Sequence, residues 1–281
     1  MATNINKVGK IVLYIFLAIT VLISLFPLIY AFLGSFKGTV EFLSGGSNII
    51  PQNWDVSNYE KAWNGADFAT YTGNTLFISI VSVIFTLAIG SMSAYALARG
   101  TFKVNSFIIK VLGLVMFVPG VVLIYPIFKL CNRLNLTGTI WSIVITQTAI
   151  GLPFLVILMW SYIVGISKEI DEAAKIDGSG FFGIYLHFIM PLSKPILATA
   201  GLLAFKNAWN SYLLPLALSL SNKSIRPLTV GILALKDVGE GISAWNIMIA
   251  GSVIALFPMI VVYLISNKYF IAGITDGAVK G

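Results

Sequence analysis

Six long apolar segments, separated by polar stretches, constrain the fold of this chain more than any other feature. A helix needs about 20 apolar residues to cross the hydrocarbon core of a membrane. We place the spans at Ile11–Phe36, Asn74–Ala98, Phe107–Phe128, Ile140–Ile163, Ile196–Ser219 and Ile247–Ser266. Backbone polar groups in lipid must pair within their own segment, so each span is predicted to be a helix. The expected fold is all-α, with six transmembrane helices.

Composition supports a membrane protein and excludes several other classes. Of the 281 residues, 58% are hydrophobic and 10% are charged, whereas soluble domains carry about 25% charged residues. The basic residues that give the net charge of +7 are scattered between apolar runs. That pattern fits lipid headgroups better than a nucleic acid. The lone cysteine, Cys131, excludes an intrachain disulfide, and we expect no bound metal.

The distribution of lysine and arginine predicts how the chain is oriented. Lys7 and Lys10 precede the first span, which is too long for the h-region of a signal peptide, so we expect it to be retained. The positive-inside rule then predicts that both termini are cytoplasmic. Residues 37–73 and 220–246 become external loops, while residues 165–195 and the tail 267–281 are cytoplasmic. We treat 1–281 as a single transmembrane domain.

The sequence contains no evident energy source for transport. None of the eleven acidic residues falls inside a predicted span, although proton-driven carriers usually need an intramembrane carboxylate. No phosphate-binding P-loop, nucleophile elbow or zinc-protease motif is present. We therefore predict that the chain is not an enzyme and that any uphill transport draws its energy from a partner.

The cytoplasmic segment 165–195 differs from its apolar surroundings. Acidic side chains gather where a short helix is expected to begin, and its positive dipole end would favour them; they are Glu169, Asp171, Glu172 and Asp177. Gly178 permits a sharp turn. An apolar and aromatic run with Phe181 and Phe182 follows, and Pro191 lies near its end. Such a segment fits either a groove on another protein or the membrane interface.

The segment "EAAKIDG" with "FIMP" after it resembles the EAA loop of ABC importer permeases, whose pattern is E-A-A-x-x-x-G, nine residues, I-x-L-P. The matching residues are Glu172, Ala173, Ala174, Gly178 and Pro191. Phe188 and Met190 replace the usual Ile and Leu, and both replacements are apolar. The resemblance implies that this loop, including Asp177, Phe181 and Phe182, docks on an ATP-hydrolysing subunit and couples it to transport.

Further motifs resemble the maltose-type second permease subunit of carbohydrate importers. They are "AYALAR" (94–99), "NLTGT" (135–139), "AWNSYLLPL" (208–216), "RPLTVGI" (226–232) and the terminal "GITDGAVKG". The resemblance implies the type I ABC importer permease fold and import of a sugar or oligosaccharide across the cytoplasmic (inner) membrane of a prokaryote. It also implies a heterodimer with a second homologous permease subunit, two ATP-binding subunits and an extracytoplasmic sugar-binding protein.

The same resemblance bears on cofactors and on the tail. It implies that ATP and Mg²⁺ bind to the partner ATPase subunits, while this chain binds no cofactor. The glycine-rich tail is too short to fold alone, so we expect it to become ordered only against a partner. The implied tail contacts with the ATPase are Gly277, Ala278, Val279, Lys280 and Gly281.

Polar residues in the fifth predicted span indicate a translocation path. They are Lys206, Asn207, Trp209, Asn210 and Tyr212. A lysine within a span is costly unless it meets water or a partner. The amides would then line a path for a hydroxyl-rich solute, with aromatic rings available for stacking; the alternative is hydrogen bonding to the partner permease. Lys206 leaves room for an anionic or phosphorylated sugar, and a membrane sensor or assembly subunit without transport is the other alternative.

Overall fold

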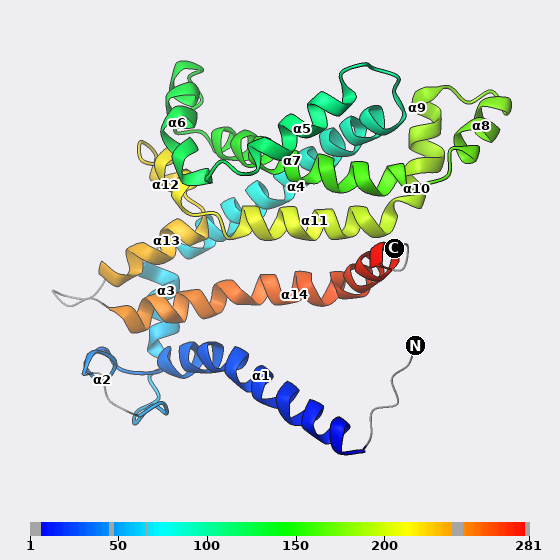
Figure 1. Ribbon diagram of the computed structural model, residues 1–281. Coiled ribbons are helices and arrows are strands. Elements are labelled where there is room, and N and C mark those ends of the chain that lie inside the picture. The colour runs from blue at the N-terminus through cyan, green and yellow to red at the C-terminus, as the bar shows by residue number, and fades with distance from the viewer. Residues whose placement is uncertain (1–6, 45–47, 66, 238–243, 279–281) are drawn as a thin grey trace. The chain divides into compact units, whose positions relative to one another are not determined.

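The computed structural model describes residues 7–44, 48–65, 67–237 and 244–278, with side chains described as far as residue 265. Every regular element within these ranges is helical, and none of them contains a strand (Figure 1). The chain divides into two compact units, each defined by close approaches between Cα atoms within it. One comprises Met1–Phe68 with Ile232–Phe257, and the other comprises Ala69–Gly231 with Pro258–Gly281. The prediction of an all-α membrane protein is confirmed.

Four helices are long and apolar enough to cross a membrane by themselves. They are α1 (Lys7–Gly34), α4 (Phe68–Arg99), α7 (Ile140–Val164) and α14 (Trp245–Ala278), the last with its apolar part ending at Ile265. Two bent helix pairs bring the total to as many as six candidate spans among the described residues. The first, second, fourth and sixth predicted spans therefore correspond to single helices.

The third predicted span, Phe107–Phe128, is not the single helix that we expected. Helix α5 (Asn105–Val115) ends before Pro119, and the chain resumes in η1 (Gly120–Leu123) and α6 (Ile124–Arg133) after a bend of 97°. Proline lacks the backbone N–H that an α-helix needs, and it disfavours the helical conformation of the residue before it. Pro119 therefore accounts for the break between α5 and η1.

The fifth predicted span, Ile196–Ser219, is also divided. Helix α11 (Lys194–Trp209) ends at Trp209, and the short helix α12 (Leu213–Leu218) begins after a break that contains Asn210, Ser211 and Tyr212. The hydroxyl of Thr229 donates to the backbone carbonyl of Ser211 at 2.7 Å. A side chain thus satisfies a carbonyl that the interrupted helix leaves without an intrahelical partner. The short helices η3 (Lys223–Ile225) and α13 (Leu228–Ala234) follow.

The tail departs from the expectation that it stays without structure of its own. Helix α14 continues through the predicted tail as far as Ala278, and Val279–Gly281 lie outside the described residues. No proline occurs between 267 and 278. Gly273 and Gly277 each cost only about 1 kcal/mol of helix propensity, which the adjoining long helix can tolerate.

Buried amides organise the first unit, which contains α2 (Thr39–Leu43), α3 (Ser57–Gly65) and η4 (Leu235–Asp237). The side-chain amide of Asn58 donates to the carbonyls of Ser35 and Lys37, both at 2.9 Å. Asn246 donates to Asn58 Oδ1 at 2.9 Å and to the Lys37 carbonyl at 3.1 Å. Since buried polar groups are costly unless paired, these bonds fix the end of α1 against α3 and the start of α14.

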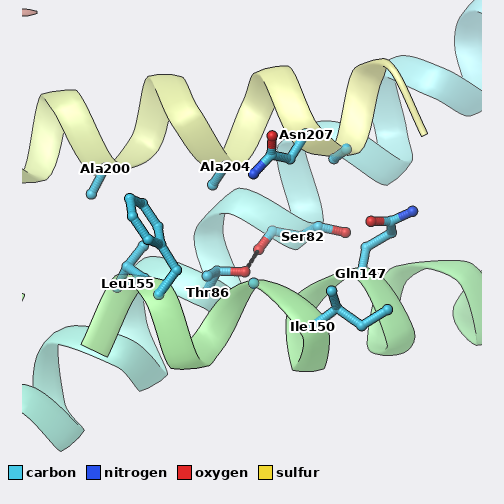
Figure 2. Close-up of a pocket in the computed structure, with 11 residues that line it drawn as sticks. Ser82, Thr86, Gln147, Ile150, Leu155, Ala200, Ala204 and Asn207 are labelled. Carbon is cyan, nitrogen blue, oxygen red and sulfur yellow. Dashed lines mark hydrogen bonds between the residues drawn. The ribbon is translucent and has the colours of Figure 1, made fainter. Parts of the chain in front are cut away.

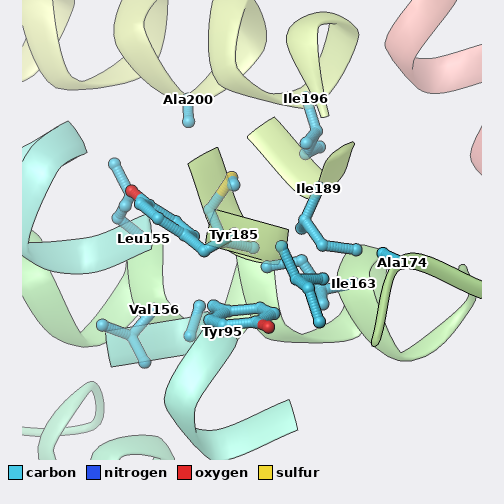
Figure 3. Packing of buried hydrophobic residues seen from close by; sticks show 12 residues of the cluster. Tyr95, Leu155, Val156, Ile163, Ala174, Tyr185, Ile189, Ile196 and Ala200 are labelled. Atoms are coloured by element: carbon cyan, nitrogen blue, oxygen red, sulfur yellow. The ribbon is translucent and has the colours of Figure 1, made fainter. Parts of the chain in front are cut away.

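The core of the second unit lies between α4, α7 and the segment that precedes α11. Figure 3 shows this packing, in which Tyr95 of α4 lies close to Val156 and Ile163 of α7 and to Tyr185. Gly90 of α4 allows a close approach, because a Cβ atom built there would lie 2.2 Å from Leu155 Cδ2. Small residues of this kind let membrane helices pack closely.

Replacing Gly90 with alanine is expected to lower the unfolding temperature of the purified chain in detergent, because the new methyl group must displace the buried Leu155 side chain. Overpacking of this kind costs about 1–3 kcal/mol. Gly113→Ala is the matched control: this glycine also lies within a helix, but nothing lies within 4 Å of its Cβ position. The control should leave the unfolding temperature unchanged or raise it, and equal shifts for both variants would contradict the packing argument.

Candidate functional site

The predicted coupling segment folds as a series of short helices in the second unit. They are α8 (Glu169–Ile176), α9 (Phe181–Ile184), the π-helix η2 (Tyr185–Ile189) and α10 (Met190–Leu192). Gly178 joins α8 to α9 with a φ of +85°, and nothing lies within 4 Å of its Cβ position. The requirement for glycine is therefore conformational rather than steric, because L side chains rarely adopt this backbone region.

The segment presents one face to its own core and another outward. Glu172, Ala173 and Asp177 are exposed, and so are Ile176, Phe181 and Phe182 despite their apolar side chains. Pro191 is exposed as well. Exposed apolar side chains beside acidic ones suit contact with a partner surface.

Ala174 departs from its predicted role as a residue that contacts a partner. Only 1% of it is exposed, and it packs within the core of the second unit. An alanine fits this position because α8 lies close to that core, where a larger side chain would need room that close packing does not leave. Ala174 therefore positions the segment instead of contacting what docks on it.

Three side chains of α4 that we did not predict hold the coupling segment in place. Arg99 Nε donates to Asp171 Oδ2 at 3.0 Å, and both side chains are almost fully buried. The Tyr95 hydroxyl donates to the Phe181 carbonyl at 3.1 Å. The hydroxyls of Ser91 and Tyr185 lie 2.8 Å apart. The sequence offered two signals for this ion pair: an arginine at the end of "AYALAR" and an acid-rich helix. Arg99 and Asp171 are 72 residues apart, so the sequence alone did not show that they pair.

Asp171→Asn is expected to destabilise the second unit strongly, since it leaves the Arg99 guanidinium buried without its counter-charge. Breaking one partner of a buried pair costs about 3–5 kcal/mol. Glu169→Gln removes the same charge from an exposed site on the same helix and should change stability little. Thermal unfolding of both variants in detergent provides the measurement, and equal effects would contradict a structural role for the pair.

A cavity of about 100 Å³, lined by both polar and apolar side chains and called the polar cavity below after its four polar residues, lies between α4, α7 and α11. Ser82 and Thr86 of α4, Gln147 of α7 and Asn207 of α11 supply its polar groups, as Figure 2 shows. Thr86 Oγ1 donates to the Ser82 carbonyl at 2.6 Å. Apolar side chains complete the lining: Ile150, Phe154, Leu155, Ala200, Ala204 and Ala208.

The predicted path residues do not share one environment. Asn207 lines the cavity, whereas Asn210 is exposed and its amide donates to the Lys206 carbonyl at 2.9 Å. Trp209 is only 2% exposed and stacks on Phe205, with ring centroids 5.5 Å apart. In this conformation its ring is therefore not free to stack on a sugar. Tyr212 is half-buried in the break between α11 and α12.

Lys206 lies in a different place from the one that a continuous fifth span would give it. It is exposed and sits in the last turn of α11, not in the middle of a long helix. The negative end of the helix dipole favours a cation there. The position explains why a lysine is tolerated, and it gives no independent argument for an anionic substrate.

Residues of α7 and α4 that we did not single out complete the cavity. Gln147 bonds to the hydroxyl of Ser211, at the break after α11, and it belongs to the cavity lining. Its position inside an apolar span was the signal that could have revealed it, because an amide within the membrane needs a partner or water. Ser82 and Thr86 gave no comparable signal, since hydroxyls can bond to their own helix.

Comparison with known proteins identifies the family. No protein-family model matches the chain. The inner membrane ABC transporter permease protein YcjP of Escherichia coli is 33% identical over 283 residues, which cover 100% of both chains. The chain belongs to the ABC transporter permeases. The arabinooligosaccharides transport system permease protein AraQ of Halalkalibacterium halodurans is 34% identical, over 92% of each chain.

Two further ABC relatives support the same assignment. The trehalose/maltose transport system permease protein MalG of Thermococcus litoralis is 32% identical over 97% of each chain. A solved chain from a bacterial ABC transporter involved in the import of the acidic polysaccharide alginate has 26% identity and a TM-score of 0.78. That similarity covers 96% of this chain and 99% of the other. The predicted ABC importer permease fold is confirmed, and the chain is a transport subunit rather than an enzyme.

Proposed function

We propose that this permease forms half of the translocation path of an importer for a sugar or oligosaccharide. Relatives that match 92% and 97% of the chain are named for arabinooligosaccharides and for trehalose and maltose, respectively, which favours sugar import over a sensor without transport. The geometric observation that carries the proposal is that α4 bears both parts of the site. Its middle contributes Ser82 and Thr86 to the polar cavity, and its end holds the coupling segment through Arg99.

The proposed complex contains a second homologous permease subunit, two ATP-binding subunits and an extracytoplasmic sugar-binding protein. ATP and Mg²⁺ would bind in the ATP-binding subunits. The exposed acidic and aromatic face around Glu172, Phe181 and Phe182 supports docking of such a subunit. We place this face, both termini and the contacts of Gly277–Gly281 on the cytoplasmic side of a prokaryotic inner membrane, as the lysine distribution predicts.

The cavity size supports a path shared with another subunit. Sites for small molecules usually enclose about 300–1,000 Å³, whereas this cavity measures about 100 Å³. It is too small for an oligosaccharide. We infer that this conformation is closed and that the path opens when the polar wall separates from a facing surface of the second permease.

Transport of a panel of labelled oligosaccharides by the reconstituted complex tests the proposed function. Asn207→Leu should lower transport about fivefold, the factor that one hydrogen bond of average strength represents. Asn210→Leu is the matched control, since Asn210 directly follows the same helix but does not line the cavity. Failure of the wild-type complex to transport any sugar would refute the substrate class, and equal loss in both variants would refute the assignment of the path.

Gly178→Val should weaken retention of the ATP-binding subunits and reduce substrate-stimulated ATP hydrolysis, because valine disfavours a φ of +85°. Gly183→Val is the control within the same segment: this glycine has no positive φ, and its Cβ position has only ordinary contacts. Co-purification and hydrolysis assays provide the measurement. Normal values for Gly178→Val would contradict the docking role of the turn.

A further inference from the structure

Helix α4 differs from the other candidate spans of the described chain because nothing interrupts it. It runs for 32 residues, Phe68–Arg99, and contains no proline. Helices α1, α7 and α14 each contain a proline, at Pro27, Pro153 and Pro258. The two other candidate spans are helix pairs bent by 97° and 80°. Kinks in helices arise mainly at proline, at Gly/Ser pairs and at breaks. Helix α4 contains one such pair, Gly90–Ser91, but among these spans it is the one without a proline or a break, so it is the span best suited to move as a unit.

Three side chains at the end of this helix lie on one face at intervals of four residues. Ser91, Tyr95 and Arg99 are therefore about 6 Å apart along the helix axis. Each one holds a different element of the coupling segment. Ser91 bonds to Tyr185 of η2, Tyr95 to the Phe181 carbonyl of α9, and Arg99 to Asp171 of α8.

The other part of the helix borders the polar cavity. Ser82 and Thr86 line it, and Gly90 lies against Leu155 of α7, which also lines it. Seventeen residues separate Ser82 from Arg99, which corresponds to about 25 Å along a straight helix. A displacement of the coupling segment that pulls on this face of α4 would therefore shift one wall of the cavity directly.

The coupling segment and α4 are held together by ring packing as well as by hydrogen bonds. The hydrogen bonds of the Tyr95, Ser91 and Tyr185 hydroxyls add a fixed orientation to this contact. The rings of Tyr95 and Tyr185 lie 5.3 Å apart, and those of Tyr95 and Phe181 lie 4.5 Å apart. Apolar packing alone does not fix direction, so the segment could slide or rotate on α4 if the hydroxyls were absent. Tyr185 also begins a π-helix, a rare form that is frequently found at functional sites.

We propose that Ser91, Tyr95 and Tyr185 are positioning residues that transmit movement of the coupling segment through α4 to the transport cavity. The proposal rests on the proposed function, in which this segment docks on an ATP-binding subunit. The hydroxyls determine how much transport each hydrolysed ATP produces. The ring packing and the Arg99–Asp171 pair keep the segment attached.

The test measures sugar transported per ATP hydrolysed by the complete complex in lipid vesicles. Tyr95→Phe and the double variant Ser91→Ala with Tyr185→Phe remove hydroxyls but preserve the rings. We expect transport per ATP to fall about fivefold in each, the factor that corresponds to one average hydrogen bond, while basal hydrolysis and subunit retention stay normal. Removing both partners of a buried bond is close to neutral for stability, so the double variant should unfold at nearly the wild-type temperature.

Two controls separate positioning from simple stabilisation. Tyr125→Phe removes an exposed hydroxyl on α6 and should leave transport per ATP unchanged. Ser91→Thr keeps a hydroxyl at the same place and should retain most of the coupling. Unchanged transport per ATP in both test variants, or a loss that tracks the unfolding temperature, would overturn the inference. A wild-type complex that fails to retain ATP-binding subunits would overturn the proposed function itself, and this inference with it.

Discussion

The buried pair of Arg99 and Asp171 is the interaction on which the arrangement of the second unit depends most. Both side chains are nearly withdrawn from solvent, and the guanidinium also donates from Nη2 to the Ile166 carbonyl at 2.8 Å. Burying two charges is costly, and the cost is recovered only when geometry and additional hydrogen bonds are favourable. Here both conditions hold. The pair fixes where α8 lies, and α8 in turn sets the position of the Gly178 turn and of the aromatic face beyond it.

Close approach of α4 and α7 has a comparable consequence for the cavity. Gly90 lets Leu155 reach the backbone of α4, and Gly151 of α7 would place a Cβ atom 3.5 Å from Thr86 Cγ2. The two helices can therefore bring hydroxyls and an amide together in a volume of about 100 Å³. In lipid, polar side chains are stabilised by hydrogen bonds to one another. Small residues allow the two helices to approach closely enough for such bonds, so both kinds of residue strengthen the contact between α4 and α7.

Much of the fold could be predicted from the sequence, because lipid allows few alternatives. The spans that became α1, α4, α7 and α14 follow from apolar length alone. The breaks at Pro119 and after Trp209 were harder to predict, since prolines also occur inside continuous helices of this chain, such as α7. Motif resemblance identified the family, and it is the basis for predicting the coupling segment. It could not reveal that Ala174 is buried or that Arg99 pairs with Asp171, because those facts depend on distant segments of the chain.

The small size of the polar cavity bears on how such a subunit preserves the electrical insulation of its membrane. A cavity needs about 10–15 Å³ of space for the centre of a water-sized probe to hold one water molecule, so the space beside Gln147 and Asn207 has room for several of them. A continuous chain of waters would have to cross a hydrocarbon core about 30 Å thick before protons could pass along it. The apolar side chains of Phe154 and Leu155 line the same space, so the proposed path would offer polar groups to a solute beside apolar surface that does not hold water in place.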